Sequence, residues 1–275
     1  MVFVLFLENC ESILYTKEKR AEELPMKEQL HTIPVNEAFD AGDECPFCHL
    51  ERRAEQSTLR YVAGPGASYM EPDVRAETDK VGFCREHTKK LYDYGNALGA
   101  ALMLQTYYAC LIDDFREGAG KFVPPGKKNL FGKRKGGEAE PFGRHLVEQT
   151  EKCFICDRLT YHMERYYHTF FVLLKEPEFR EKLMNCKGFC LRHFGEMLDA
   201  AEKYLPNNQH DWFYEEIFQL EEKHLIRVKE DLDWLIAKYD YRNAGADWKN
   251  SKDALQRTMQ KLEGIYPADK PYTKD

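Results

Sequence analysis

One pattern of metal-ligand residues occurs twice in this 275-residue chain and restricts the folds open to it. Each copy is a CxxC followed by a GFCxxH; the ligand-type residues are Cys45, Cys48, Cys84 and His87 in the first, and Cys153, Cys156, Cys190 and His193 in the second. The spacers between the second cysteine of CxxC and the cysteine of GFCxxH are nearly equal, with 35 residues in the first copy and 33 in the second. Three thiolates and one imidazole make a complete tetrahedral ligand set for zinc. The sequence therefore predicts two zinc ions per chain, each joining segments that lie far apart in sequence.

The matched spacers favour local sites, in which the four residues of each copy bind one ion. The alternative is an exchanged arrangement, in which Cys45 and Cys48 join Cys190 and His193. Four protein ligands leave no coordination position for water, so both sites are predicted to be structural. His49 and Cys186 could compete as ligands, but they are expected to pack or to contact the ligands from outside. Arg85 and Arg192 could offset the negative charge of three thiolates.

Three other chemistries are open to these residues. The Cys45-Pro-Phe-Cys48 segment looks like a glutaredoxin-type redox pair, but such a pair follows a strand in a βαβ unit, and no strand pattern precedes it. An iron–sulfur cluster could also use the cysteines. Plain buried cysteine and histidine is the third reading, and two coordinated copies argue against it. No GxSxG, P-loop, GxGxxG or HExxH motif occurs, so the sequence favours a protein that is not an enzyme.

The repeat extends beyond the ligands. Glu71-Pro72-Asp73-Val74-Arg75 precedes the first GFC, and Glu176-Pro177-Glu178-Phe179-Arg180 precedes the second. Each copy is thus CxxC, a helix-length stretch, EP-acid-apolar-Arg, a short stretch and GFCxxH. This order indicates an internal duplication of one helical unit.

Helical periodicity dominates the rest of the chain, and no run of alternating β-branched residues is found. Four apolar stripes predict helices: Leu91, Tyr94, Leu98, Ala101, Gln105, Tyr108, Ile112 and Phe115; Leu159, Met163, Tyr166, Phe170 and Leu173; Phe213, Ile217, Leu220, Val228, Leu232, Leu235 and Tyr239; and, after Ser251, Leu255, Met259 and Leu262. Cys110 lies in an apolar helix and is expected to be a small core residue; His162 and His168 are expected to be hydrogen-bonded core or surface histidines, with a catalytic or metal role as the alternative. The predicted fold class is all-α, a helical bundle of two zinc-stapled units and a C-terminal helical segment.

The predicted organisation has five parts. Residues 26–117 form the first zinc repeat, 144–205 the second, and 206–275 C-terminal helices that pack on the body. Residues 118–143 are rich in Gly, Pro and Lys and are expected to be a flexible basic linker. Residues 1–25 are expected to be a leader, possibly disordered, or a start assigned too early, because Glu22-Glu23 implies a purine run, like a ribosome-binding site, just before Met26.

Charge and hydropathy argue against some classes of binding partner. A net charge of −7 argues against nucleic acid, except through the basic stretch 121–135, and no apolar run is long enough to cross a membrane. Six of the nine cysteines are at metal-ligand spacing, which favours a reducing cytoplasm.

The chain resembles an uncharacterised bacterial family of proteins with a domain of unknown function. The resemblance rests on Cys45-Pro-Phe-Cys48, the EPDVR, GFCREH, LGAALMLQT and GFCLRHF segments, and the KYDYRNAGADWKNSKDALQR tail, and covers about residues 26 to 265. It implies a cytosolic metal-binding protein and marks the same eight ligands, without implying a reaction. It also singles out Tyr239-Asp240-Tyr241-Arg242, which is expected to cap the helical body; a solvated helix end is the equally open alternative.

The sequence therefore favours a non-catalytic zinc protein that acts as an interaction or assembly module with an unknown protein partner. A redox-responsive or metal-handling protein, binding zinc or iron–sulfur, is the alternative. An enzyme with an unrecognised site is the third interpretation.

Overall fold

The computed structural model describes residues 29–122 and 141–265, and in these ranges all regular structure is helical. The α-helices are α1 (Gln29–Asp40), α2 (Pro46–Ala63), α3 (Pro72–Val81), α4 (Arg85–Tyr94), α5 (Ala97–Lys121), α6 (Phe142–Glu151), α7 (Phe154–Leu173), α8 (Pro177–Asn185), α9 (Leu191–Tyr204), α10 (His210–Ala237) and α11 (Ala254–Glu263). Short 3-10 turns follow α2, α9 and α10 at Ser68–Met70, Asn207–Gln209 and Tyr241–Asn243. The all-α prediction is confirmed. None of the described helices is long and apolar enough to cross a membrane.

The duplication covers five helices in each half of the chain. α1 to α5 and α6 to α10 follow the same order: a leading helix, a helix opened by CxxC, a helix opened by Pro, a helix opened by GFCxxH, and a long helix. Pro72 and Pro177 of the EP motifs occupy the first turns of α3 and α8, where proline's missing amide hydrogen costs nothing. α11 has no counterpart among the described residues of the first half.

The glycine of each GFC motif has a positive φ: +62° for Gly82, which ends α3, and +79° for Gly188, which lies two residues after the C-cap of α8. A side chain there would also collide with the long helix of the same half. A Cβ on Gly82 would lie 2.5 Å from the Tyr107 ring, and one on Gly188 would lie 2.7 Å from the Glu221 carboxylate. Only glycine combines this backbone conformation with so close an approach.

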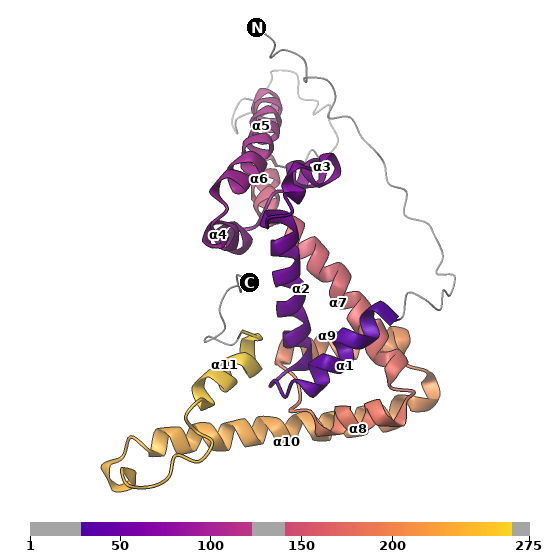
Figure 1. Cartoon of the computed structure of the whole chain (residues 1–275), viewed down its shortest axis with the longest axis vertical. Coiled ribbons are helices and arrows are strands. Elements are labelled where there is room, and N and C mark those ends of the chain that lie inside the picture. Colours follow the sequence, from indigo (N-terminus) through magenta and orange to yellow (C-terminus); the bar gives the residue numbers. More distant parts are fainter. Residues whose placement is uncertain (1–28, 123–140, 266–275) are drawn as a thin grey trace, which may run out of the picture.

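α2 and α7 form the central strut and run in opposite directions (Figure 1). The first half of α2 packs in a large aromatic core with α1, α8, α9 and most of α7, around Phe47 and Phe170. The second half of α2 packs in a smaller core with α3, α4, α5 and the first turn of α7, around Leu59 and Phe154. Each end of the strut thus joins the start of one CxxC helix to the end of the other.

Of the four predicted apolar stripes, the structure confirms the one on α7 and corrects the other three. The stripe on α7 is buried at Met163, Tyr166, Phe170 and Leu173, as expected, and the stripe on α10 is buried as far as Val228. The stripe from Leu91 to Phe115 is not one helix, because Gly95 ends α4 and the Asn96 side chain accepts a hydrogen bond from Gly99 N to start α5.

The apolar stripe predicted for α11 faces outward, not toward the core. Leu255, Met259 and Leu262 are exposed, and the buried side chains include Arg257, Gln260 and Lys261. The reason is the polar surface that α11 covers: Gln260 donates to Asp43 at 2.5 Å, and Arg257 to Asp231 at 2.9 Å.

The expectation for the tail after α10 is also wrong. Tyr239 and Tyr241 are exposed, and the turn is instead closed by Lys238, whose ammonium group donates to the carbonyls of Asn243, Ala244 and Ala246. The predicted linker 118–143 is shortened, since α5 continues through Lys121 and α6 begins at Phe142. Most of that linker, its basic cluster and the predicted leader 1–25 lie outside the described residues.

Candidate metal centres

The first cluster, site 1, joins the start of α2 to the start of α9. Its four members are Cys45, Cys48, Cys190 and His193, all fully buried. The Sγ atoms of Cys48 and Cys190 lie 3.6 Å apart. His193 Nδ1 lies 3.5 Å from the sulfur of Cys45 and 3.3 Å from each of the other two.

The second cluster, site 2, joins the start of α7 to the start of α4. Its members are Cys84, His87, Cys153 and Cys156. The Sγ atoms of Cys84 and Cys156 lie 3.8 Å apart, and His87 Nδ1 lies 3.3 Å from all three sulfurs. His87 and Cys153 are buried, but Cys84 and Cys156 are only half-buried.

The two clusters correct the expectation of local sites. The structure brings together the eight residues named from the sequence, but each CxxC pairs with the GFCxxH of the other half. The physical reason is the antiparallel strut: the start of α2 lies at one end and the start of α7 at the other, beside the GFCxxH helix of the opposite half (Figure 1). Nearly equal spacers are compatible with both the local and the exchanged pairing, so spacing alone does not distinguish the two.

Helix starts position the sulfurs. Cys45 is the N-cap of α2, and its Sγ accepts a hydrogen bond from Cys48 N at 3.4 Å; Cys190 caps α9 in the same way and accepts from His193 N at 3.5 Å. A residue three positions after the N-cap lies one turn further on the same side of the helix, so both ligands of each motif point to one place. The positive end of the helix dipole and the N–H groups there favour thiolate.

The distances fit a tetrahedral zinc ion. Bonds of about 2.3 Å to sulfur and 2.0 to 2.1 Å to nitrogen imply edges of about 3.8 Å between sulfurs and about 3.6 Å between sulfur and nitrogen. The measured edges in the two clusters run from 3.3 to 3.8 Å. Both histidines turn Nδ1 inward, which leaves Nε2 for an outside partner.

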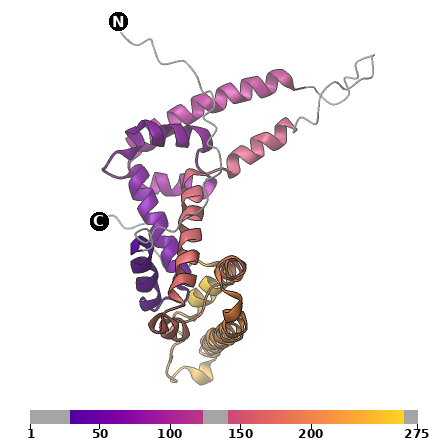
Figure 2. The same cartoon turned by 90° about the vertical axis from the view of Figure 1, so that its right-hand side faces the viewer.

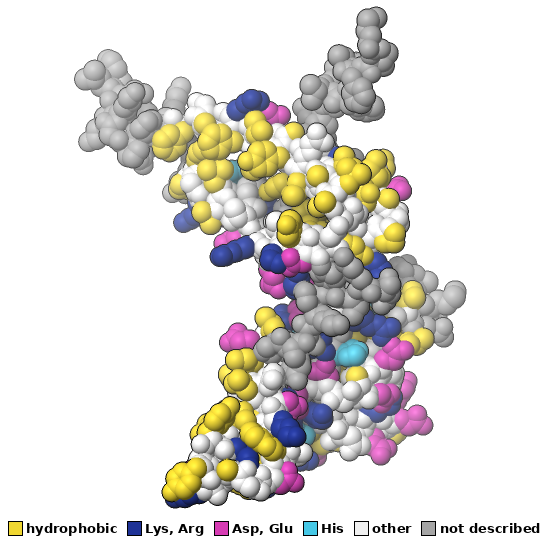
Figure 3. Space-filling view, turned by 60° about the vertical axis from the view of Figure 1, so that its left-hand side comes forward, with side chains coloured by type: hydrophobic (Ala, Val, Ile, Leu, Met, Phe, Trp, Pro, Cys, Tyr) yellow, Lys and Arg dark blue, Asp and Glu magenta, His cyan; other side chains and the backbone are white. Residues whose placement is uncertain are grey.

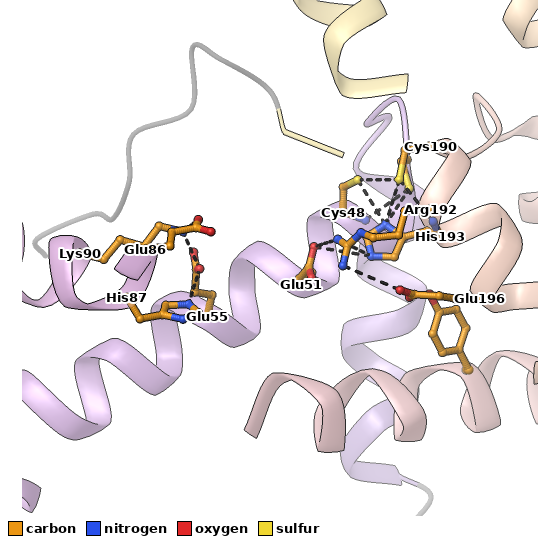
Figure 4. A network of polar contacts seen from close by, with 12 residues as sticks. Cys48, Glu51, Glu55, Glu86, His87, Lys90, Cys190, Arg192, His193 and Glu196 are labelled. Carbon is orange, nitrogen blue, oxygen red and sulfur yellow. Dashed lines mark hydrogen bonds and ion pairs between the residues drawn. The ribbon is translucent and has the colours of Figure 1, made fainter. Parts of the chain in front are cut away.

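The partners of the two histidine Nε2 atoms both lie on α2. Glu55 on α2 lies 3.0 Å from His87 Nε2, and Glu51, one turn earlier, lies 3.5 Å from His193 Nε2 (Figure 4). A carboxylate that accepts from Nε2–H fixes the tautomer in which Nδ1 can bind a metal. Sequence reasoning missed both glutamates, although their positions three and seven residues after Cys48 place them on the same face of α2 as that ligand.

The surroundings of the two carboxylates differ. Lys90 donates to Glu55 at 2.6 Å, and Glu86 lies 2.8 Å from the same ammonium group. At site 1, the Arg192 guanidinium bonds to Glu51 and lies 3.1 Å from His193 Nε2. Of the four candidates for such contacts, Arg192 therefore touches a ligand. Arg85 is exposed, Cys186 packs in the large core, and His49 lies near Arg52 and Arg53.

A family model covers most of the chain. A model described as a family of unknown function, DUF6062, matches residues 26–269. The chain belongs to this family. The paired CxxC motifs and the two Cys/His groups are consistent with that membership. Searches of curated proteins and of solved structures find no match.

The side chains of site 2 shift one another's pKa values. Hydrogen bonds, first from Cys156 and then from His87, lower the pKa of Cys153 to about 3, and the neighbouring thiolate in turn raises the pKa of Cys156. Burial alone would lower the pKa of His87, but its hydrogen bonds to Cys153 and Glu55 raise it to about 10. A metal ion that takes the place of these protons releases them, so binding and acidity are linked.

α11 covers site 1. Gly264, which ends this helix with φ +76°, lies so close that a Cβ there would be 3.3 Å from Cys190 Sγ and 3.5 Å from Cys48 Sγ. Lys261 donates to three carbonyls of the ligand-bearing loops, at 2.9 Å to Glu44, 2.6 Å to Lys187 and 3.1 Å to Phe189. This buried cation binds both loops and opposes the negative charge of the thiolates.

A cleft of about 370 Å³ lies between α2, α7 and α9, from Cys156 of site 2 to Arg192 beside site 1. Leu159, Met163 and Ala200 form an apolar part of its wall. The Tyr167 hydroxyl donates to Glu196 at 2.8 Å at its edge. The cleft makes one flank of site 2 reachable from outside.

Proposed function

We propose that this chain is a zinc-dependent, non-catalytic scaffold, in which two structural Cys₃His sites lock the halves of a duplicated helical protein together. The observation that carries the proposal is the exchange of ligands: each site takes two ligands from residues 45–87 and two from residues 153–193. An ion at either site closes a loop of more than 60 residues, and two ions interlock the halves.

The donor set supports zinc and a structural role. Three thiolates and one imidazole suit zinc, and four protein ligands leave no position for a reacting water. This structural role requires no catalytic pair of acidic and basic side chains in the cleft. The scaffold would act in the cytoplasm as an assembly module, with a protein partner rather than nucleic acid or membrane.

The test is the metal content of the purified protein together with its response to a chelator. We expect two zinc ions per chain, no visible absorbance, and loss of tertiary structure when both ions are removed. Brown colour and iron would contradict zinc. Full retention of the near-ultraviolet circular dichroism without metal would contradict the structural role.

A second function is favoured by one observation: Cys84 and Cys156 are only half-buried, and Cys156 lines the cleft. Thiolates that oxidants can reach release zinc when they are oxidised. In that case site 2 would act as a redox-responsive or metal-handling site, while site 1 maintains the fold. Reversible loss of one ion under mild peroxide would favour this role, and resistance of both ions to peroxide would exclude it.

A further inference from the structure

The long helix α5 presents an apolar face to the outside. Its first sixteen residues, Ala97–Ile112, contain no charged side chain, and only Gly99 and Met103 are buried along the whole helix. Leu98 is 68% exposed and Tyr108 63% exposed. A charge-free helical run of this length is normally covered by other protein.

The exposed residues follow the seven-residue repeat of a coiled coil. The a and d positions of α5 are Leu98, Ala101, Gln105, Tyr108, Ile112, Phe115 and Ala119, and Phe122, the C-cap residue, continues the spacing just beyond the helix; all of them are exposed. The positions that face the body are different ones: Met103 is buried, Thr106 donates to Asp79 at 2.5 Å, and Tyr107 lies over Gly82. α5 therefore has an inner face that holds it to α3 and an outer seam whose period suits a partner helix.

The seam is long and accessible. With a rise of 1.5 Å per residue, the 25 residues of α5 extend about 37 Å. Figure 2 shows α5 and α6 extending away from the rest of the body, and Figure 3 shows hydrophobic side chains gathered over this upper part. Phe115 and Phe122 contact the Phe142 ring of α6, at 5.6 and 6.4 Å, yet both stay half-exposed. α6 itself has no buried residue.

The order of side chains along the seam matches its own reverse. In an antiparallel pair of α5 helices centred between Ala109 and Leu111, each a position meets a d position of the other copy. Small residues then face small ones and large face large: Leu98 meets Phe122, Ala101 meets Ala119, Gln105 meets Phe115, and Tyr108 meets Ile112.

The a and d positions of the seam carry no charged residue. Asp113, Asp114 and Glu117 lie at the b, c and f positions, away from the seam, and Arg116 and Lys121 pair with Asp113 and Glu117. These charges therefore do not distinguish a parallel from an antiparallel pair, and the antiparallel direction rests on the order of small and large side chains along the seam. In the antiparallel pair the bodies lie on opposite sides of the helix pair, since each body is on the inner face.

We propose that the outer seam of α5 is a homodimer interface, in which α5 packs antiparallel against α5 of a second copy of this chain. The inference rests on the proposed scaffold role and specifies what the scaffold assembles: two copies of itself. A different protein on this seam is an outcome of the test below.

The first test is the mass of the metal-loaded protein by light scattering at micromolar concentration. We expect twice the 32.3 kDa of one chain. Ala101→Glu and Ala119→Lys, each placing one charge in the seam, should each give the monomer mass. Leu255→Glu, at an exposed apolar position on α11, is the matched control and should remain dimeric. A monomeric wild type, or a dimer that both seam variants leave intact, would overturn the proposal and leave the seam to a different partner.

The second test is specific for direction. An equal mixture of A101E and A119K should regain the dimer mass, because one end of the antiparallel pair then joins glutamate to lysine and the other end has wild-type alanines. In a parallel pair, the two charges would never meet, and the mixture would stay monomeric. Zinc content and circular dichroism of each variant are measured in the same samples, so that failure of the scaffold proposal is distinguished from failure of the dimer.

Discussion

The two metal centres have the same ligands and the same strut but different protection. Site 1 is fully buried in the large aromatic core and is covered by α11, whereas two cysteines of site 2 are half-buried beside the smaller core, and one of them, Cys156, lines the open cleft. The difference follows from the extra helix at the C-terminal end, because α11 brings Lys261 and Gly264 to site 1. The two duplicated centres therefore differ in exposure: site 1 is protected, and site 2 can be reached from outside.

The largest difference is expected when one ligand is removed from each site. Cys190→Ser should lose one ion and lower the free energy of unfolding by more than about 4 kcal/mol, the range typical of a lost metal in a buried site. Cys84→Ser should also lose one ion but cost about 2 kcal/mol, because the smaller core around site 2 buries less apolar surface. Metal analysis and denaturant unfolding measure both quantities.

The control for these variants is Cys110→Ser, since Cys110 on α5 belongs to neither cluster. It should retain both ions and change the unfolding free energy by less than about 1 kcal/mol. Equal losses of stability in the two ligand variants would show that protection by α11 and the large core adds nothing.

A smaller difference is expected in the rate of metal loss. With a chromogenic chelator in excess, zinc should leave in two phases, the fast one from site 2. Lys261→Met removes the cation that joins both ligand loops of site 1, so the slow phase should accelerate by about tenfold or more, in line with other contacts around metal ligands. The fast phase should not change.

Lys229→Met is the matched control for Lys261→Met, since Lys229 is an exposed lysine paired with Asp233 on α10. It should leave both phases at their wild-type rates. A single release phase in the wild type, or an unaltered slow phase in the Lys261 variant, would show that α11 does not protect site 1.

The smallest expected difference is in stability at low pH, and it comes from His224, on the side of the molecule that carries α11. His224 on α10 has a pKa lowered to about 4, by burial first and then by Arg227 and Lys261, and its Nδ1 accepts a hydrogen bond from Arg227 at 3.0 Å. The unfolded chain, with a histidine pKa near 6.5, binds the proton more readily than the native protein. Native stability should therefore fall as the pH is lowered from about 6.5 towards 4.

His224→Gln removes that proton site while retaining an acceptor for Arg227. Melting temperatures at pH 7 and pH 5.5 should differ less in this variant than in the wild type, and protonation of the metal ligands contributes equally to both proteins. The same pH dependence in the two proteins would remove His224 as a cause.

The sequence predicted the helical class and the eight clustered residues, because both depend on local patterns. Periodicity reports which residues can share a helix face, and CxxC and CxxH place two ligands on one helical turn. The pairing of the half-sites was predicted wrongly, since it depends on the antiparallel packing of α2 against α7, which no local spacing encodes.

The polar contacts show the same limit. Glu51 and Glu55 lie among many glutamates, and only the approach of α9 and α4 to α2 distinguishes them. The inverted face of α11 has a similar cause: the surface it covers carries Asp43, Glu44 and backbone carbonyls, so its polar side is the one that binds. Amphipathic patterning predicts burial correctly only when the covered surface is apolar.

If each metal ion joins the two halves of the chain, anomalous diffraction at the zinc edge from crystals of the purified protein will show it. We expect two zinc peaks per chain, one bound by Cys45, Cys48, Cys190 and His193 and the other by Cys84, His87, Cys153 and Cys156. A zinc ion bound by four ligands of a single half, or crystals without a zinc peak at these residues, would contradict the account.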